Sequence, residues 1–380
     1  MSGFGLYVHW PFCTAKCPYC DFNSHVRSSI DEDGWLEAVL RELAYVAELQ
    51  SDDRPILQTI FFGGGTPSLM SGRAVGRVID EAARLWRSAN DLEITMEANP
   101  ASADAARFAD YAKAGVGRLS LGVQALNDAD LKFLGRLHNV GEAKAALALA
   151  QRTFPRVSFD LIYARPNQSV TAWREELAEA LSFGTEHLSL YQLTIEPGTP
   201  FAALHRQGAL RIPEDDLGAA FYEATQDVAA AGGLPAYEVS NHARPGCESR
   251  HNLLYWRYGS YAGVGAGAHG RLDLGGKRFA TVCERLPERW REKVMSDGHG
   301  FIEMSEIEPR DAAREHLMMN MRLNEGLDLG AYYARWGLAP PPQRIAALVE
   351  ARLVRHEHDR LSATPQGMLL LNRVIAELTL

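Results

Sequence analysis

Apolar and polar positions alternate along the first two thirds of the chain in a regular strand–helix rhythm. Short apolar runs have the length of buried strands, about four to eight residues. They are Leu6–Trp10, Leu57–Phe62, Leu92–Met96, Leu119–Val123, Val157–Tyr163 and Leu188–Leu193. Between them apolar residues recur at helical spacing, which predicts helices. These cover Asp31–Leu49, Arg73–Trp86, Ala103–Ala114, Gly141–Thr153, Val170–Leu181 and Asp215–Ala231.

This alternation predicts an α/β fold with a parallel sheet. Successive strands start roughly 25–50 residues apart, which is the spacing of βαβ units. A closed barrel of this kind has eight units, whereas the pattern here provides six. We therefore expect a partial (β/α)6 TIM-like barrel over residues 1–233. A flat doubly wound sheet is the alternative that periodicity alone leaves open.

The rhythm ends near Gly233, which predicts a smaller second domain of mixed α/β and helical structure over residues 234–380. Pro235–Gly270 is rich in glycine, tyrosine, histidine and asparagine, which indicates loops with short strands. Helices are expected at Ala312–Arg322, Leu329–Trp336 and Arg344–Ala351, a hairpin at Leu353–Ser362, and a closing helix at Pro365–Leu378. Helices around a small hairpin resemble a winged helix. However, residues 341–380 carry five basic and four acidic side chains, which gives no reason to expect nucleic acid.

Composition and charge narrow the class of protein. The chain has 380 residues, of which 46% are apolar and 23% charged, and its net charge is −9. An acidic chain does not attract phosphate backbones over its whole surface. No apolar run is long enough to span a bilayer. Since the first residues also lack the pattern of a signal peptide, we expect the cytoplasm.

Three of the five cysteines are clustered, as FCTAKCPYCDF with C-x3-C-x2-C spacing. Clustered thiols in a reducing compartment indicate metal ligands rather than disulfides. Cys13, Cys17 and Cys20 suit three irons of a [4Fe–4S] cluster, which would leave the fourth iron open to a small molecule. A zinc site that adds His9 or His25, and cysteines that merely pack, are the alternatives.

Glycines and polar residues that could bind a ligand also lie in or directly after the next predicted strands. Gly63-Gly64-Gly65-Thr66-Pro67 follows the second strand, Glu97 ends the third, Gln124 ends the fourth and Asp160 lies in the fifth. Each alone is equally well explained as a turn, a helix cap or a satisfied interior group. The cysteine loop, the glycine run, Glu97 and Gln124 together fall at the carboxyl ends of parallel strands, the edge that carries the active site in barrels. This pattern predicts a cofactor pocket.

These motifs resemble those of a known family. YVHWPFCTAKCPYCDF, FFGGGTP, EANP, LGVQ, GRLH and FDLIYARP look like the ordered motifs of radical S-adenosylmethionine (SAM) proteins of the oxygen-independent coproporphyrinogen III oxidase group. The resemblance covers nearly the whole chain and implies a cluster on the three cysteines. It also implies that SAM is surrounded by Tyr7, Tyr19, Gly64, Gly65, Thr66, Glu97, Gln124, Arg136 and Asp160. Arg136 suits a carboxylate because its guanidinium forms two parallel hydrogen bonds. The family's GLP after DLIY is Ala164-Arg165-Pro166 here, so that loop is expected to differ.

Two differences separate the branches of this group. The oxidase branch carries a fourth cysteine two positions after the third, where this chain has Phe22. The HemW-type heme chaperones lack it and carry HNxxYW, which this chain has as HNLLYW from His251 to Trp256. YEVSNHARPG and GVGAGAHG also look like the chaperone branch. From the residues alone, a packed loop in which His251 bonds to the backbone explains HNLLYW better than a heme site does.

The resemblance therefore implies a heme chaperone that holds a [4Fe–4S] cluster, SAM and heme. His251 is the expected iron ligand, with Cys247 as the alternative and His242 and His269 as weaker candidates. We expect the heme site to lie in a different domain from the cluster. Heme-accepting proteins, among them membrane-bound respiratory enzymes, are the expected partners; a homodimer and peripheral association with the membrane stay open. The rival functions are the SAM-dependent oxidase and another radical SAM enzyme such as a methyltransferase.

Overall fold

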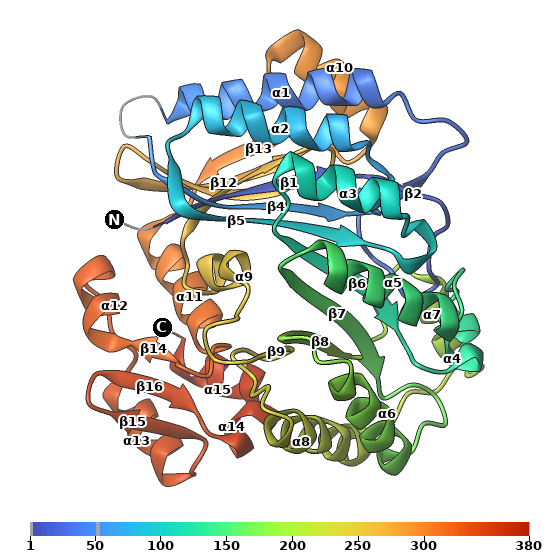
Figure 1. The fold of residues 1–380 in the computed structure, drawn as a ribbon. Helices are drawn as coiled ribbons and strands as arrows, with labels where there is room; N and C mark the ends of the chain where they lie inside the picture. Colours follow the sequence, from blue (N-terminus) through green and yellow to red (C-terminus); the bar gives the residue numbers. More distant parts are fainter. Residues whose placement is uncertain (1–2, 51–53, 380) are drawn as a thin grey trace.

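The computed structural model describes residues 3–50 and 54–379. Six parallel strands form the centre of one large curved sheet, in the order in which they occur along the chain (Figure 1). They are β1 Phe4–Trp10, β4 Leu57–Gly64, β5 Ser88–Ala98, β6 Arg118–Gln124, β7 Arg156–Tyr163 and β8 His187–Gln192. The predicted partial barrel is confirmed.

Helices cover the outer face of these strands (Figure 1). They are α1 Glu32–Leu49, α2 Gly72–Leu85, α3 Ala105–Ala114, α5 Val140–Thr153, α6 Val170–Ser182 and α8 Asp215–Ala231. The apolar face predicted for the first helix is the buried one, since Trp35, Val39 and Leu43 are almost fully excluded from solvent. Its start is set by Asp31, whose carboxylate accepts a hydrogen bond from the Gly34 N–H.

Short elements lie at the carboxyl ends of the parallel strands, where the site was expected. They are β2 Phe12–Cys13, β3 His25–Val26, the 3₁₀ turns Pro67–Leu69 and Pro100–Ser102, α4 Asp128–Phe133 and α7 Pro200–Arg206. Within the described part of the chain, no helix has both the length and the apolar character to cross a membrane.

The sheet continues beyond residue 233, first in the region where loops with short strands were expected and then past residue 270. Strand β10 Ser260–Val264 pairs in parallel with β1, and antiparallel strands extend the sheet from there. These are β11 His269–Leu274, β12 Lys277–Cys283 and β13 Phe301–Glu306, while α10 Pro287–Asp297 packs beside α1. At the other edge, β9 Asn241–Ala243 is antiparallel to β8. A domain boundary at residue 233 stays a prediction, but the strands on both sides of it share one sheet.

The last part of the chain builds its own small apolar core. Buried residues from Ala313 to Leu378 form one cluster, separate from the barrel core that runs from Phe4 to Phe301. Its elements are α11 Pro309–Asn320, β14 Leu327–Asp328, α12 Leu329–Trp336, α13 Pro342–Glu350, β15 Val354–Glu357, β16 Arg360–Ala363, α14 Pro365–Leu369 and α15 Leu371–Leu378. The predicted hairpin is present, but the single closing helix is wrong: the chain leaves helical geometry at Leu370 and forms two helices.

Candidate functional site

The three clustered cysteines lie on the loop that follows β1. Cys13 belongs to β2, and the Cys20 N–H donates to the Cys17 carbonyl at 3.2 Å, which folds the loop back on itself. All three thiols are free and partly buried. Burial raises the pKa of the Cys13 and Cys20 thiols, so holding them as thiolates needs compensating positive charge or hydrogen bonds.

Two side-chain donors reach the sulfurs of Cys13 and Cys17. The Thr66 hydroxyl donates to Cys13 Sγ at 3.3 Å, and Arg136 Nη1 donates to Cys17 Sγ at 3.4 Å. Hydrogen bonds to sulfur are one way in which a protein tunes an iron–sulfur cluster. Arg136 Nε is buried and has no partner among the described residues. The guanidinium therefore keeps a donor for a ligand carboxylate beside the thiols.

The thiols do not form a ready-made site for one metal ion. Within the described residues, no three histidine, cysteine, aspartate or glutamate side chains converge as the ligands of a single ion would. A cubane cluster binds each thiolate to a different iron and so spaces its sulfurs more widely. The loop and its two donors fit a cluster of that kind.

The glycine run packs directly against the cysteine loop. The Gly65 N–H donates to the Trp10 carbonyl at 2.7 Å, and the Thr66 N–H to the Phe12 carbonyl at 2.9 Å. A Cβ on Gly65 would lie 2.6 Å from the Phe12 carbonyl oxygen. Gly64 has φ +110° and would meet the His9 ring. Gly65 is thus required by the close approach of Phe12, and Gly64 by its positive φ and the neighbouring His9 ring, whatever they also offer to a ligand.

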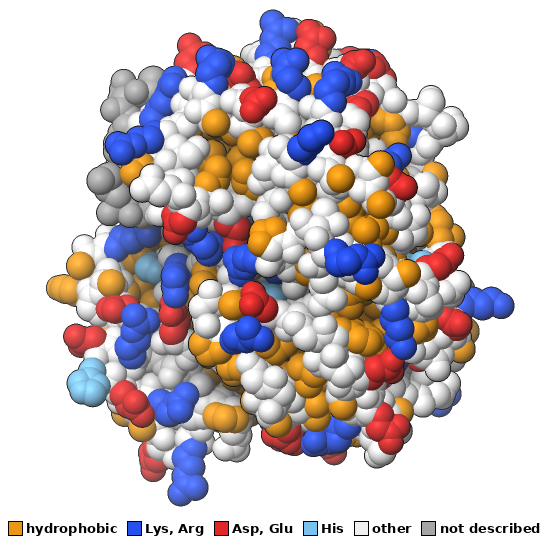
Figure 2. All heavy atoms as spheres, viewed as in Figure 1, with side chains coloured by type: hydrophobic (Ala, Val, Ile, Leu, Met, Phe, Trp, Pro, Cys, Tyr) orange, Lys and Arg blue, Asp and Glu red, His pale blue; other side chains and the backbone are white. Residues whose placement is uncertain are grey.

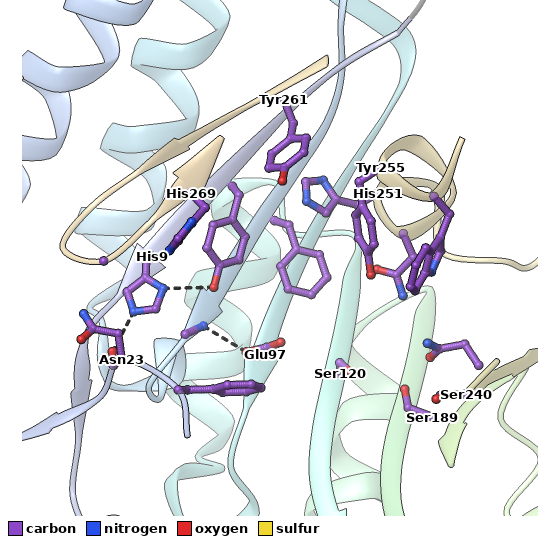
Figure 3. Close-up of a pocket in the computed structure, with 18 of the residues that line it drawn as sticks. His9, Asn23, Glu97, Ser120, Ser189, Ser240, His251, Tyr255, Tyr261 and His269 are labelled. Atoms are coloured by element: carbon purple, nitrogen blue, oxygen red, sulfur yellow. Dashed lines mark hydrogen bonds between the residues drawn. The ribbon is translucent and has the colours of Figure 1, made fainter. Parts of the chain in front are cut away.

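A cavity of about 1050 Å³ fills the barrel and reaches beyond it, between the cysteine loop and β11–β13 (Figure 3). Of the predicted site residues, it is lined by Tyr7, Gly64, Glu97, Asp160 and His251. Tyr19, Gln124 and Arg136 lie outside this lining: Tyr19 and Arg136 interact with Cys17, and Arg136 and Gln124 both border Gly122. The predicted residues therefore form two neighbouring groups, one in the cavity and one beside the thiols.

Burial raises the pKa of three acidic residues that line the cavity, Glu238 and the two predicted site residues Glu97 and Asp160. Burial, followed by the charge of Asp160, raises the pKa of Glu97 to about 8, although the Gly64 N–H donates to it at 3.3 Å. Burial raises the pKa of Asp160 to about 6. A cation entering the cavity would favour both carboxylates in their charged form.

His9 is a neutral histidine held between two partners. Its Nε2 lies 2.8 Å from the Asn23 carbonyl, which only accepts, so Nε2 carries the proton (Figure 3). Nδ1 then accepts from the Tyr7 hydroxyl at 3.1 Å. Burial lowers the pKa of His9 to about 4. Because both ring nitrogens are engaged, His9 does not complete a metal site with the cysteines.

The HNLLYW segment lies in helix α9, Arg250–Trp256, where loops with short strands were expected. A helix of seven residues is not stable alone. It is held at the amino end of the barrel by Glu93, which accepts from the N–H groups of Arg250 at 3.0 Å and His251 at 3.2 Å. Arg156 donates to the same carboxylate at 2.6 Å. This attachment directs His251 and Tyr255 into the cavity.

His251 is 5% exposed, and its ring stacks on Phe61 at a centroid distance of 5.0 Å. Its Nδ1 lies 2.8 Å from the Thr59 hydroxyl, while Nε2 has no hydrogen bond to any described residue. Burial lowers the pKa of His251 to about 3, so the ring is neutral at physiological pH. His251 shares its cavity with Glu97 and Gly64. The expectation that the heme site lies in a different domain from the cluster stays a prediction, although one cavity joins His251 to residues of the barrel strands.

The other candidate iron ligands are placed differently. His269 lines the outer part of the cavity, whereas Cys247 and His242 are not among the described residues that line it. Sequence reasoning missed Thr59 and Glu93, which orient His251. Alternation within the second and third strands places them on the inward-facing side with Phe61 and Glu97, although it does not identify His251 as their partner.

Comparison with known proteins identifies the class. Residues 7–181 match the radical SAM superfamily, and residues 307–370 match the HemN C-terminal domain. The heme chaperone HemW of Escherichia coli is 38% identical, over 97% of this chain and 96% of that protein. The mitochondrial radical S-adenosyl methionine domain-containing protein 1 of Bos taurus is 37% identical, over 98% of this chain and 86% of its own length.

A solved structure agrees in fold. Coproporphyrinogen III oxidase (HemN) from Escherichia coli superposes with a TM-score of 0.82 at 20% identity and covers 100% of this chain and 90% of that one. The fold and the cysteine loop thus define a radical SAM protein, a class that implies a [4Fe–4S] cluster and SAM. Within that class, the chain belongs to the family of the HemW-type proteins.

Proposed function

We propose that this protein is a heme chaperone: it binds heme and passes it to acceptor proteins, and it carries a [4Fe–4S] cluster and SAM. The observation that carries the proposal is His251, a neutral imidazole that faces a cavity of about 1050 Å³ with Nε2 free of hydrogen bonds to described residues. A neutral imidazole can ligate heme iron without first losing a proton. Near full-length similarity to proteins named heme chaperones supports the same reading.

The cluster and SAM residues are assigned as follows. Cys13, Cys17 and Cys20 hold the cluster. The SAM residues are Tyr7, Tyr19, Gly64, Gly65, Thr66, Glu97, Gln124, Arg136 and Asp160. The free donor of Arg136 suits the SAM carboxylate, and the carboxyl groups of Glu97 and Asp160 suit its positive charge. When bound, the cluster supplies an electron for cleaving the sulfonium; the residues described here bind and orient.

The charge of the cavity favours a chaperone over the oxidase. The lining includes two arginines and five acidic residues, namely Arg118, Arg285, Asp21, Glu97, Asp160, Glu238 and Glu303. The oxidase substrate carries four carboxylates and must bring some of them close to the cluster, and Arg118 and Arg285 are the two arginines of the described lining that could pair with them. A chaperone can leave both heme propionates at the mouth of the cavity. Phe22, at the position of the oxidase's fourth cysteine, lines the cavity and is 58% exposed.

The acceptors we propose are heme proteins, including membrane-bound respiratory enzymes. The protein would work in the cytoplasm, with peripheral contact to the membrane, and a homodimer is the assembly to test. Nucleic acid is not proposed as a partner: on the face shown in Figure 2, basic and acidic side chains are interspersed.

The test uses anaerobically reconstituted protein, expected to contain about four irons and four sulfides. Heme titration should give a Soret band of protein-ligated iron without SAM cleavage. His251→Ala should shift or abolish that band, because the iron loses an axial ligand, whereas the matched control His205→Ala should not. His205 bonds to the Leu210 carbonyl and does not line the cavity within the described chain.

Two results would change the assignment. A larger effect of Cys247→Ala would make the thiol the ligand. Catalytic conversion of coproporphyrinogen III to protoporphyrinogen, with SAM and a reductant present, would replace the chaperone with the oxidase.

A further inference from the structure

The segment GVGAGAHG, residues 263–270, has no part in the function proposed so far. It connects β10 to β11 and approaches the chain at His9 and Asn23, before and after the cysteine loop. A Cβ on Gly265, which has φ +102°, would overlap the His9 carbonyl. A Cβ on Gly267, which has φ +80°, would overlap the amide of Asn23. Both glycines are therefore needed because the segment touches the chain on either side of the cysteines.

Asn23 makes the contact. Its Nδ2 donates to the carbonyls of Ala266 and Arg285, both at 2.9 Å. Its own carbonyl accepts from His9 Nε2 at 2.8 Å (Figure 3). The Asn23 side chain thus donates both of its amide protons to the 263–285 segment, and the Asn23 backbone bonds to His9 of β1. Asn23 lies three residues after Cys20, so it fixes the end of the cysteine loop.

The segment that receives Asn23 is itself anchored in the core. The buried carboxylate of Glu42, on α1, accepts from the N–H groups of Gly265 at 2.8 Å and Gly300 at 2.7 Å. It also accepts from Trp290 Nε1 at 3.1 Å. The Gly267 N–H donates to the Glu284 carbonyl at 2.8 Å. The segment that carries the Ala266 and Arg285 carbonyls is therefore fixed to the core by these hydrogen bonds.

We propose that Asn23 is a positioning residue for the cluster, and that it clamps the cysteine loop to the 263–285 segment. The start of the loop is held by the glycine run, through Trp10 and Phe12, and its end is held by this clamp. With both ends fixed, the thiols lose less conformational freedom when they bind iron. The proposal concerns the cluster alone and does not depend on heme binding.

Asn23→Ala and Asn23→Asp test it. Both remove the two donors; the aspartate keeps the size of the side chain and turns an oxygen towards two carbonyls. In the chain without its cluster, amides of residues 13–23 should exchange hydrogen about tenfold faster, because two hydrogen bonds that close the loop are lost. After reconstitution, the variants should lose iron to a chelator faster than the wild type does. With SAM bound, the EPR signal of their reduced cluster should differ from the wild-type signal. Gly267→Ala should act in the same direction.

Asn324→Ala is the matched control, since Asn324 Nδ2 donates to the Ala236 carbonyl at 2.6 Å, away from the cysteines. It should leave loop exchange and iron release unchanged. The proposal is overturned if both Asn23 variants exchange and release iron as the wild type does. It is equally overturned if they speed exchange uniformly and lower the melting temperature, because Asn23 would then stabilise the whole fold rather than the loop.

Discussion

At the scale of single residues, Glu97 links the sequence pattern to a measurable property. Its place at the end of a parallel strand made it a candidate, and the fold adds the burial and the neighbouring Asp160 that raise its pKa to about 8. Near neutral pH most of this carboxyl group is protonated in the empty cavity. SAM is a cation at its sulfonium and favours the carboxylate, so its binding should release a proton.

This coupling predicts that SAM binds more tightly as pH rises. Below the pKa of about 8, binding must first deprotonate Glu97. The affinity should therefore increase between about pH 6 and 8, by up to about tenfold per pH unit, and level off above 8. Glu97→Gln should bind SAM more weakly and lose the slope. Calorimetric titration across this range measures both, with Glu303→Gln in the same cavity as the control. A flat wild-type profile, or a slope that survives in Glu97→Gln, would rule out the coupling.

Other residues could not be assigned from the sequence. The cysteines, the glycine run and Glu97 lie in local sequence patterns that indicate their chemistry. Asn23 and Thr59 have no distinguishing pattern in the sequence, because their partners are distant along the chain. Asn23 bonds to the carbonyls of residues 266 and 285, and Thr59 bonds to His251. Sequence periodicity carries no information about such partners.

At the scale of secondary-structure elements, α9 shows why one helix was missed. The periodic spacing of apolar residues predicts the long amphipathic helices. Helix α9 has only seven residues and depends on Glu93 from β5. The same dependence explains the sheet beyond β1. Strand β10 lies in a glycine-rich stretch that looks irregular, and it pairs with the edge of β1, after which β11–β13 add to it in turn.

Removing the Glu93 carboxylate should therefore release α9. Glu93→Ala leaves two helix N–H groups and Arg156 without their buried partner, and we expect unfolding to become easier by about 2–4 kcal/mol. The Soret band of bound heme should also shift, because His251 is no longer held in place. Urea unfolding and heme titration measure the two effects. Glu186→Ala removes an exposed pair with Arg244 at 3.2 Å and should cost under about 1 kcal/mol. Equal effects of the two variants would mean that Glu93 is not the anchor of α9.

At the scale of the whole molecule, the sheet joins parts of the chain that the sequence pattern separates. The barrel core includes Val264, Trp290 and Phe301, all far beyond residue 233. The next natural break lies before α11, where the second apolar cluster begins. Contacts across that break include the ion pair of Arg271 with Glu315 at 3.0 Å and the stacking of Tyr258 on His316 at a centroid distance of 5.3 Å. Val239 also packs against the second apolar cluster.

Two truncated chains should behave differently for this reason. A chain ending at residue 233 loses β10, which pairs with the edge of β1, and the Asn23 clamp; it should aggregate and fail to hold iron. A chain ending at residue 306 keeps the whole large sheet and the clamp. It should stay soluble with a lower melting temperature and still bind about four irons after reconstitution. Size-exclusion chromatography with iron and sulfide analysis compares them. A monomeric, fully loaded 1–233 chain would establish the boundary at residue 233, and failure of the 1–306 chain would make α11 to α15 part of one cooperative fold with the barrel.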